Sequence, residues 1–205
     1  MKFLLFLSTI LWLSLAVGGV FYLAQYGNTS IEIDVSYPTA FPPESRIERD
    51  GGRPILIFFA HPKCPCTRAS LRELSRLMTS VDGKLQAYVV FIKPKGESEK
   101  WTETDLRANA EAIPNVRVVI DEDERETRIF GAQTSGLILL YDRNGNLRFN
   151  GGITASRGHE GDNAGRGAIF EIITEDDFKT AKTSVFGCPL HKKDCHGELM
   201  ENPQQ

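Results

Sequence analysis

The sequence has few cysteines, little net charge and no internal repeat. Of its 205 residues four are cysteines, and 24 basic against 27 acidic side chains give a formal charge of −3. Because there is no basic excess, nothing in the composition favours binding to nucleic acid. We therefore expect a single domain with a sizeable core, in addition to any membrane anchor.

Charge is almost absent from the amino-terminal end of the chain. Lys2 is the only charged side chain before Glu32, and residues 3–26 form an uncharged hydrophobic run. About 20 apolar residues span a bilayer, whereas a cleavable signal peptide has an apolar core of about 7–15 residues. We expect an uncleaved anchor at residues 1–26 that crosses the membrane with residues 3–26; cleavage after residues 16–19 is the alternative.

The charges that flank this run predict its orientation. Lys2 and the amino terminus precede it, and Glu32 and Asp34 follow it. The positive flank of a membrane helix stays in the cytoplasm, so residues 27–205 should lie outside. The sequence predicts a single-pass protein of the inner (cytoplasmic) membrane with a periplasmic domain, in a compartment where disulfides form.

The rest of the chain alternates between strand and helix patterns. Prolines and an Asp-Gly-Gly turn give residues 27–54 the composition of a linker, in which residues 31–35 predict a short edge strand. Thr102 and Asp105 resemble a capping box that opens a helix closed by Pro114. Strands are expected at 55–60, 85–93, 116–120, 137–141 and 147–150, and further helices at 67–81, 121–130 and, as one or two helices, roughly 165–183.

This order predicts an α/β fold, a thioredoxin-like mixed sheet flanked by helices and preceded by one transmembrane helix. We place the thioredoxin-like domain at residues 55–185 and a tail that contains Cys and His at 186–205. The turn between the first strand and the first helix of the domain carries Cys64-Pro65-Cys66. Free N–H groups and the helix dipole at such a turn favour negative charge, so a thiol there ionises more easily. This position indicates redox or metal chemistry.

Several segments resemble the bacterial thioredoxin-like proteins known as RedB: FFAHPKCPCTRASL, TSGLILLYDRNGNL, GGITASRGHEGDNAGR and VFGCPL. More distantly, the domain is similar to membrane-anchored thiol–disulfide oxidoreductases of the TlpA and ResA type. The resemblance implies exchange with extracytoplasmic protein thiols and disulfides, and with a membrane or periplasmic redox partner.

Two departures from the thioredoxin pattern stand out. Thioredoxins carry Cys-x-x-Cys, and an ungapped alignment places Lys63 at its first cysteine and Cys66 at its second. Thioredoxins also have a cis-proline opposite the active site, where this chain has Thr134-Ser135-Gly136. The second difference puts ordinary thioredoxin-like exchange in question.

Cys64 and Cys66 are the main candidate site. A disulfide between them would close a tight, strained ring that is easily reduced. On this interpretation Cys64 is the exposed attacking thiol and Cys66 its partner, although the roles could be reversed. His61 and Lys63 precede them, where a cation favours a thiolate and a neutral imidazole can ligate a metal.

Asn144-Gly145 predicts a hairpin between the strands at 137–141 and 147–150, and a second group of polar residues follows it at residues 156–163. The hairpin returns the chain to the end of the sheet where the cysteines lie, so this loop should lie beside them. Arg157 offers a cation, His159 a proton shuttle, and Glu160 and Asp162 carboxylates, all of which can tune a thiol. The alternative is a surface loop ordered by its own polar groups.

A third group lies in the tail, where Cys188, His191, Cys195 and His196 follow one another closely. Their spacing matches neither a known zinc motif nor the haem-attachment motif. We expect a Cys188–Cys195 disulfide that staples the tail. Metal binding, or a resolving role for Cys188 at the active site, are the alternatives.

These patterns lead to one principal function and two alternatives. The principal one is a membrane-tethered thiol–disulfide oxidoreductase whose Cys64–Cys66 pair cycles between dithiol and disulfide without a cofactor. The first alternative is copper handling, with Cys64, Cys66 and His61 or His159 as soft ligands for Cu(I). The second is a thiol peroxidase, although the chain lacks the Pro-x-x-x-Thr-x-x-Cys pattern of peroxiredoxins.

Overall fold

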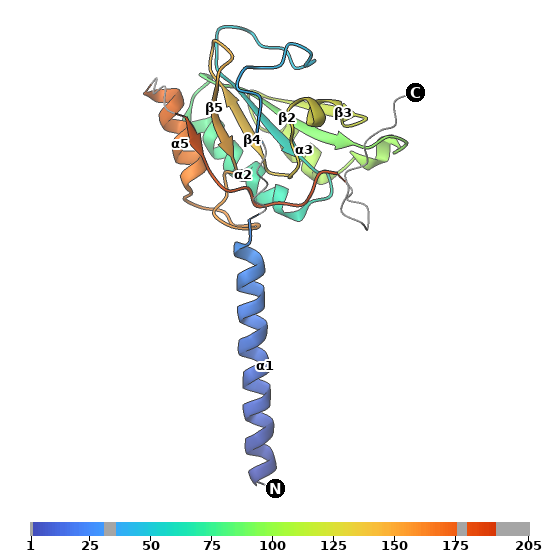
Figure 1. Ribbon diagram of the computed structural model, residues 1–205, viewed down its shortest axis with the longest axis vertical. Helices are drawn as coiled ribbons and strands as arrows, with labels where there is room; N and C mark the ends of the chain where they lie inside the picture. Colours follow the sequence, from blue (N-terminus) through green and yellow to red (C-terminus); the bar gives the residue numbers. More distant parts are fainter. Residues whose placement is uncertain (1, 31–35, 176–179, 192–205) are drawn as a thin grey trace.

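The computed structural model describes residues 2–30, 36–175 and 180–191 (Figure 1). The edge strand predicted at 31–35 lies outside the described residues. The first helix, α1 (Lys2–Asn28), projects from the folded domain, and none of its residues is buried. Its 27 residues are long and apolar enough to cross a membrane.

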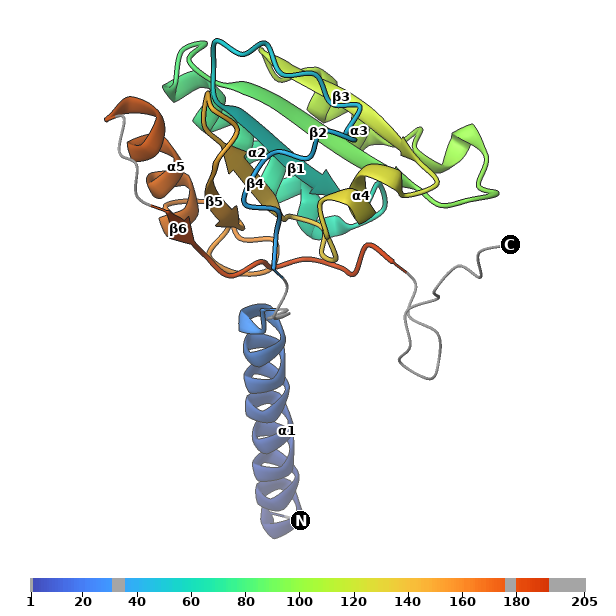
Figure 2. The same cartoon turned by 45° about the horizontal axis from the view of Figure 1, so that its top comes forward.

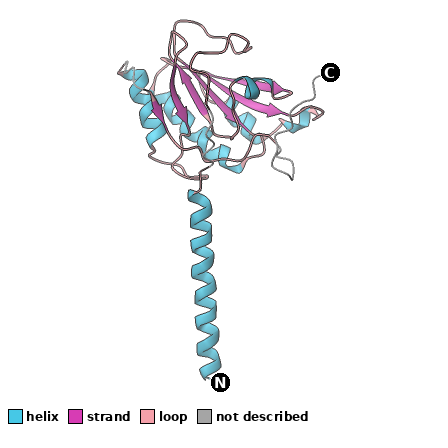
Figure 3. Ribbon diagram, in the orientation of Figure 1, coloured by secondary structure: helices cyan, strands magenta, loops and turns pink. Residues whose placement is uncertain are grey.

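The domain is built on one mixed sheet of six strands in the order β3-β2-β1-β4-β5-β6 (Figure 3). The central strands β1, β2 and β3 are parallel, β4 runs antiparallel to β1, and β5 pairs with β4 as a hairpin. The strands are β1 (Ile55–Ala60), β2 (Gln86–Lys93), β3 (Val116–Glu122), β4 (Ile138–Tyr141), β5 (Leu147–Gly151) and β6 (Ala181–Lys182). This is the predicted thioredoxin-like fold.

Helices cover one face of the sheet. These are α2 (Pro65–Ser80), α3 (Asp105–Glu111) and α5 (Ala164–Thr174), whereas α4 (Arg125–Ile129) lies toward the other face (Figure 2). The helix α2 buries an apolar stripe that includes Leu71, Leu74 and Leu77 against alternate residues of β1 and β2. Because both faces of the central strands are covered, β1 and β2 are buried throughout.

Irregular segments cover the opposite face. Phe41 packs edge-on against Phe130 and Tyr141, and Ile47 is buried, so part of the predicted linker forms this second core. Val185 and Leu190, on either side of the predicted start of the tail, are also buried in it. The packed part of the domain therefore continues to residue 190.

Two predicted details were wrong. The helix α3 is capped by Thr104, whose hydroxyl accepts from the Arg107 amide, and not by Thr102. Residues 181–182, predicted as helix, form β6, because they pair in parallel with residues 149–150 of β5. Tertiary pairing here outweighs the local pattern.

Candidate active site

The strand β1 and the helix α2 together position the two cysteines of the turn. Cys64 is the N-cap of α2 in an extended backbone conformation, and Pro65 occupies the first turn of the helix, where its missing N–H costs nothing. The Cys64 amide donates to the His61 carbonyl at 3.1 Å, and the Cys64 carbonyl accepts from the Thr67 amide at 3.1 Å. The Cys64 sulfur therefore lies at the positive end of a 16-residue helix.

A segment distant in sequence, residues 183–191, lies against this turn. It runs antiparallel to residues 133–135, with a β-bridge between Thr134 and Pro189. The Ser135 amide donates to the Cys188 carbonyl at 2.8 Å. In Figures 1 and 2 the segment crosses the domain surface on the side from which α1 departs. We call it the docked segment.

The docked segment brings a third cysteine to the site. The sulfur atoms of Cys64 and Cys188 lie 2.9 Å apart. Cys64 was predicted to be exposed, and this was wrong: only 1% of its surface is accessible. Cys188 and Cys66 are partly exposed. Cys195, the predicted partner of Cys188, lies outside the described residues.

The environment of Cys64 favours its thiolate. Burial would raise the pKa of this thiol, but hydrogen bonds from the thiol and amide of Cys188, the Thr67 hydroxyl and the Cys66 amide outweigh burial and lower it. The other two thiols behave in the opposite way. Burial raises the pKa of Cys188 to about 12, with a further contribution from Cys64. Cys64 is accordingly the most nucleophilic of the three near neutral pH.

Arg157 is the residue of the 156–163 loop that reaches the thiols. Its guanidinium donates to the Gly187 carbonyl at 2.6 Å, which ties the loop to the docked segment. Burial and the charge of Cys64 raise the pKa of Cys66, and Arg157 acts against this rise through its charge and a hydrogen bond. The Arg157 amide also donates to the Gly27 carbonyl at the end of α1.

His61 and Lys63 lie on the other side of the turn, against Trp101. The Lys63 ammonium lies 3.6 Å from the centre of the indole ring, and the His61 ring meets that indole edge-on. Burial, and secondarily the charge of Lys63, lower the pKa of His61, so its imidazole is neutral at pH 7. The contact with Trp101 holds the cation of Lys63 over an aromatic face.

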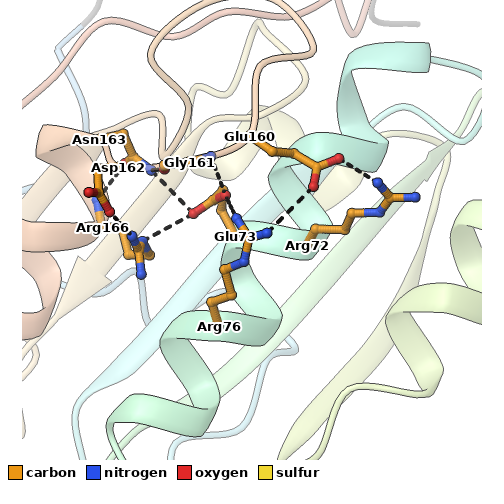
Figure 4. Close-up of polar contacts among 8 residues, drawn as sticks. All are labelled: Arg72, Glu73, Arg76, Glu160, Gly161, Asp162, Asn163 and Arg166. Carbon is orange, nitrogen blue, oxygen red and sulfur yellow. Dashed lines mark hydrogen bonds and ion pairs between the residues drawn. The ribbon is translucent and has the colours of Figure 1, made fainter.

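The carboxylates of the loop, Glu160 and Asp162, pair with arginines of α2 and α5 (Figure 4). Glu160 pairs with Arg72 at 2.6 Å and with Arg76 at 3.7 Å. Asp162 pairs with Arg166 of α5 at 2.9 Å. His159 is exposed, and its side chain has no hydrogen-bond or ion-pair partner among the described residues. A catalytic part for His159 stays a prediction.

Two groups at the site escaped the sequence analysis. Glu73 of α2 has a fully buried side chain that pairs with Arg76 and Arg166 and accepts from the Gly161 amide. The Ser135 hydroxyl bonds to the Thr67 hydroxyl and accepts from the His61 amide, both at 2.9 Å. The departure at 134–136 from the thioredoxin pattern was the available signal for Ser135.

The residues of the copper alternative do not gather into a recognisable site. Within residues 2–30, 36–175 and 180–191 there is no group of three or more His, Cys, Asp and Glu side chains suited to hold a metal ion. His191, a candidate ligand of the tail, instead contacts Glu124 and the Ala132 carbonyl, each at 3.1 Å. His196 lies outside the described residues.

Comparison with known proteins supports the fold. No family model matches the chain, and no curated protein matches it by sequence. The domain is similar to the solved structure of a hypothetical protein from Sinorhizobium meliloti 1021, with a TM-score of 0.60 and 16% identity over 79% of this chain and 97% of that chain. It is also similar to an uncharacterized conserved protein from Geobacillus kaustophilus, with a TM-score of 0.62 and 17% identity over 82% of this chain and 98% of that chain. The pneumococcal exposed lipoprotein thioredoxin Etrx1 from Streptococcus pneumoniae matches less well, with a TM-score of 0.43 and 17% identity over 61% of this chain and 86% of that chain. The order and direction of the strands are those of the predicted thioredoxin-like fold, and a helix at the amino-terminal end could anchor the chain in a membrane.

Proposed function

We propose that this chain is a membrane-tethered, extracytoplasmic thiol–disulfide oxidoreductase of the RedB kind, with Cys64 as its attacking thiol. One observation carries the proposal: the Cys64 sulfur lies at the amino-terminal end of α2, with a lowered pKa and a second thiol 2.9 Å away. A lowered pKa supplies the reactive thiolate, and a neighbouring thiol can complete a dithiol–disulfide cycle.

The reaction starts with the Cys64 thiolate. It attacks one sulfur of a partner disulfide, a mixed disulfide forms, and the partner's other sulfur leaves as a thiolate. A second cysteine of this chain then attacks the Cys64 sulfur and releases the partner's remaining thiolate. Two cysteines of the chain are oxidised and the partner disulfide is reduced; one released thiolate takes the proton of the second cysteine, and the other takes a proton from solvent. The reverse sequence oxidises a partner.

The partner is a redox protein at the outer surface of the cytoplasmic membrane. The docked segment lies on the side of the domain from which α1 departs, and Arg157 contacts the end of α1 through the Gly27 carbonyl (Figure 1). With α1 in the membrane, that side of the domain would face the bilayer. Membrane proteins that present thiols or disulfides at its surface are then within reach.

The exchange reaction can be tested on the purified full chain in detergent. We expect the reduced protein to react with the aromatic disulfide DTNB, and the Cys64→Ser variant to lose the fast phase of thionitrobenzoate release. The Cys195→Ser variant, altered outside the described site, is the matched control. Unchanged fast release from the Cys64→Ser variant would contradict the proposal.

An anaerobic titration with Cu(I) addresses the copper alternative in the same preparation. We expect no stoichiometric, high-affinity binding that depends on Cys64 and Cys66. If such binding appears, and the protein fails to exchange with DTNB, the chain belongs with copper-handling proteins. Protease digestion of a carboxyl-terminal tag in spheroplasts tests the predicted orientation, which requires the tag to be accessible.

A further inference from the structure

We propose that Cys188 is the resolving cysteine of this site, and that the oxidised protein carries a Cys64–Cys188 disulfide. The docked segment then has a second purpose beyond packing, since it presents the resolving thiol to Cys64 and covers that sulfur. This inference rests on the proposed function and replaces the expected Cys64–Cys66 pair.

The geometry favours Cys188 over Cys66. The Cys64 and Cys188 sulfurs are in contact at 2.9 Å. Cys66 also lies near Cys64: burial raises the pKa of the Cys66 thiol, and the charge of Cys64 and a hydrogen bond between the two thiols add to this rise. The two residues are separated by Pro65 alone, however, so a disulfide between them would close a tight, strained ring. Arg157 stabilises Cys66 as a thiolate, and this stabilisation would be lost if Cys66 entered a neutral disulfide. Cys188 reaches Cys64 from a separate segment and needs no tight ring.

The docked segment is held on both sides of Cys188. The Leu190 amide donates to the Gln133 carbonyl at 2.9 Å, and the Leu190 side chain is buried. On the amino-terminal side, the Gly187 backbone lies so close to Ser135 that an added Cβ would come within 1.7 Å of the Ser135 carbonyl oxygen. Only glycine permits this approach. Backbone contacts on both sides of Cys188 therefore fix it beside Cys64.

The electrostatics suit an ordered, two-step exchange. In the reduced state Cys188 is held as a thiol, since burial and the adjacent Cys64 both raise its pKa. When Cys64 enters a mixed disulfide it loses its negative charge, and its contribution to the raised pKa of Cys188 disappears. Cys188 then loses its proton more easily and attacks the Cys64 sulfur; a Cys64–Cys188 bond forms, and the bond from Cys64 to the partner breaks. The proton goes to the partner thiolate that leaves.

Trapping with oxidised glutathione tests the assignment in the full chain. After quenching with iodoacetamide and digestion without reductant, we expect the parent protein and Cys66→Ser to yield a Cys64–Cys188 cross-linked peptide. Cys188→Ser should instead accumulate glutathione on Cys64. Glutathione trapped by Cys66→Ser but not by Cys188→Ser, or a Cys188–Cys195 peptide as the main product, would overturn the proposal. A parent protein whose Cys64 does not react with glutathione disulfide would contradict the proposed function itself.

A glycine substitution separates the two parts of the proposal. Gly187→Ala forces the docked segment away from Ser135, so the first step at Cys64 should become faster and the resolving step slower. Gly167→Ala in α5 is the control, because an added Cβ there meets nothing within 4 Å. If Gly187→Ala folds with the parent's far-UV circular dichroism and shifts neither rate, the segment does not present the resolving thiol.

Discussion

The helix α2 carries two buried acidic groups that are used in opposite ways. Glu73 has a side chain that is 0% exposed, and its carboxylate is surrounded by two arginines, Arg76 and Arg166, and the Gly161 amide (Figure 4). Cys64, at the start of the same helix, is 1% exposed and is stabilised as a thiolate by the helix end and neutral donors, among them Cys188.

The difference lies in whether the partners can be exchanged. Arginine keeps its charge, so the counter-charges around Glu73 are permanent, and these pairs fasten the loop that follows β5 onto α2. The partner of Cys64 is another thiol, which can give up its proton or become covalently bonded. A buried anion with permanent counter-charges is structural, whereas one held by exchangeable donors remains available for chemistry. The predictions below test this distinction in order of expected effect.

The largest effect is expected for Cys64→Ser. A serine hydroxyl does not ionise near neutral pH, so disulfide exchange with DTNB should fall to the rate measured without protein. The free energy of unfolding in urea should change by less than about 1 kcal/mol, because the side chains are similar in size. A loss of stability comparable to that of a Glu73 variant would erase the proposed contrast.

Glu73→Gln should have the next largest effect, and on stability rather than chemistry. It removes the buried counter-charge of Arg76 and Arg166, so we expect a loss of about 2–3 kcal/mol, moderated because both arginines can reach water. Glu160→Gln, whose side chain is 28% exposed, is the control and should cost about 0–1 kcal/mol. Urea denaturation compares the two. Equal losses would mean that the burial of Glu73 confers no special role.

The sequence predicted those parts of the fold that depend on local pattern. The apolar run at 55–60 matches β1 residue for residue, and the Asn-Gly pair at 144–145 lies in the turn of the predicted hairpin. The turn that contains Cys64 could be located because it lies between the apolar run of β1 and the helix pattern of α2. The division of the chain into anchor, linker, domain and tail stays a prediction.

What could not be predicted depends on contacts between distant segments. Nothing in the local sequence around Glu73 reveals that Gly161 and Arg166 enclose its carboxylate. The contact between Cys64 and Cys188, 124 residues apart, requires the docked segment to pair with residues 133–135. Spacing alone favoured nearby partners, Cys66 for Cys64 and Cys195 for Cys188.

The third prediction concerns the donors to the Cys64 thiolate. The rate of alkylation by iodoacetamide rises with pH as a thiol ionises, so a lowered pKa places the midpoint for Cys64 below that of an ordinary cysteine. Cys188→Ala removes one donor to the thiolate and should move this midpoint to higher pH. Cys188→Ser keeps a hydroxyl donor and should move it less. Identical profiles for the two variants would show that the Cys188 side chain is not a donor to Cys64.

The smallest effect is expected at Arg157, and it should fall on Cys66. Arg157 lowers the pKa of Cys66 against the rise caused by burial and by Cys64, so Arg157→Ala should raise that pKa and slow alkylation of Cys66 near neutral pH. Arg157→Lys, which keeps the charge, should restore part of the rate. His159→Ala in the same loop tests the predicted proton shuttle separately: a changed cysteine profile would support that part, and unchanged profiles would leave His159 as an exposed surface residue. Residue-resolved mass spectrometry of iodoacetamide-labelled protein across pH measures both thiols at once. If the profile of Arg157→Ala matches that of the parent, Arg157 does not tune Cys66. Its contacts with Gly187 and Gly27 would then give it a structural role like that of Glu73.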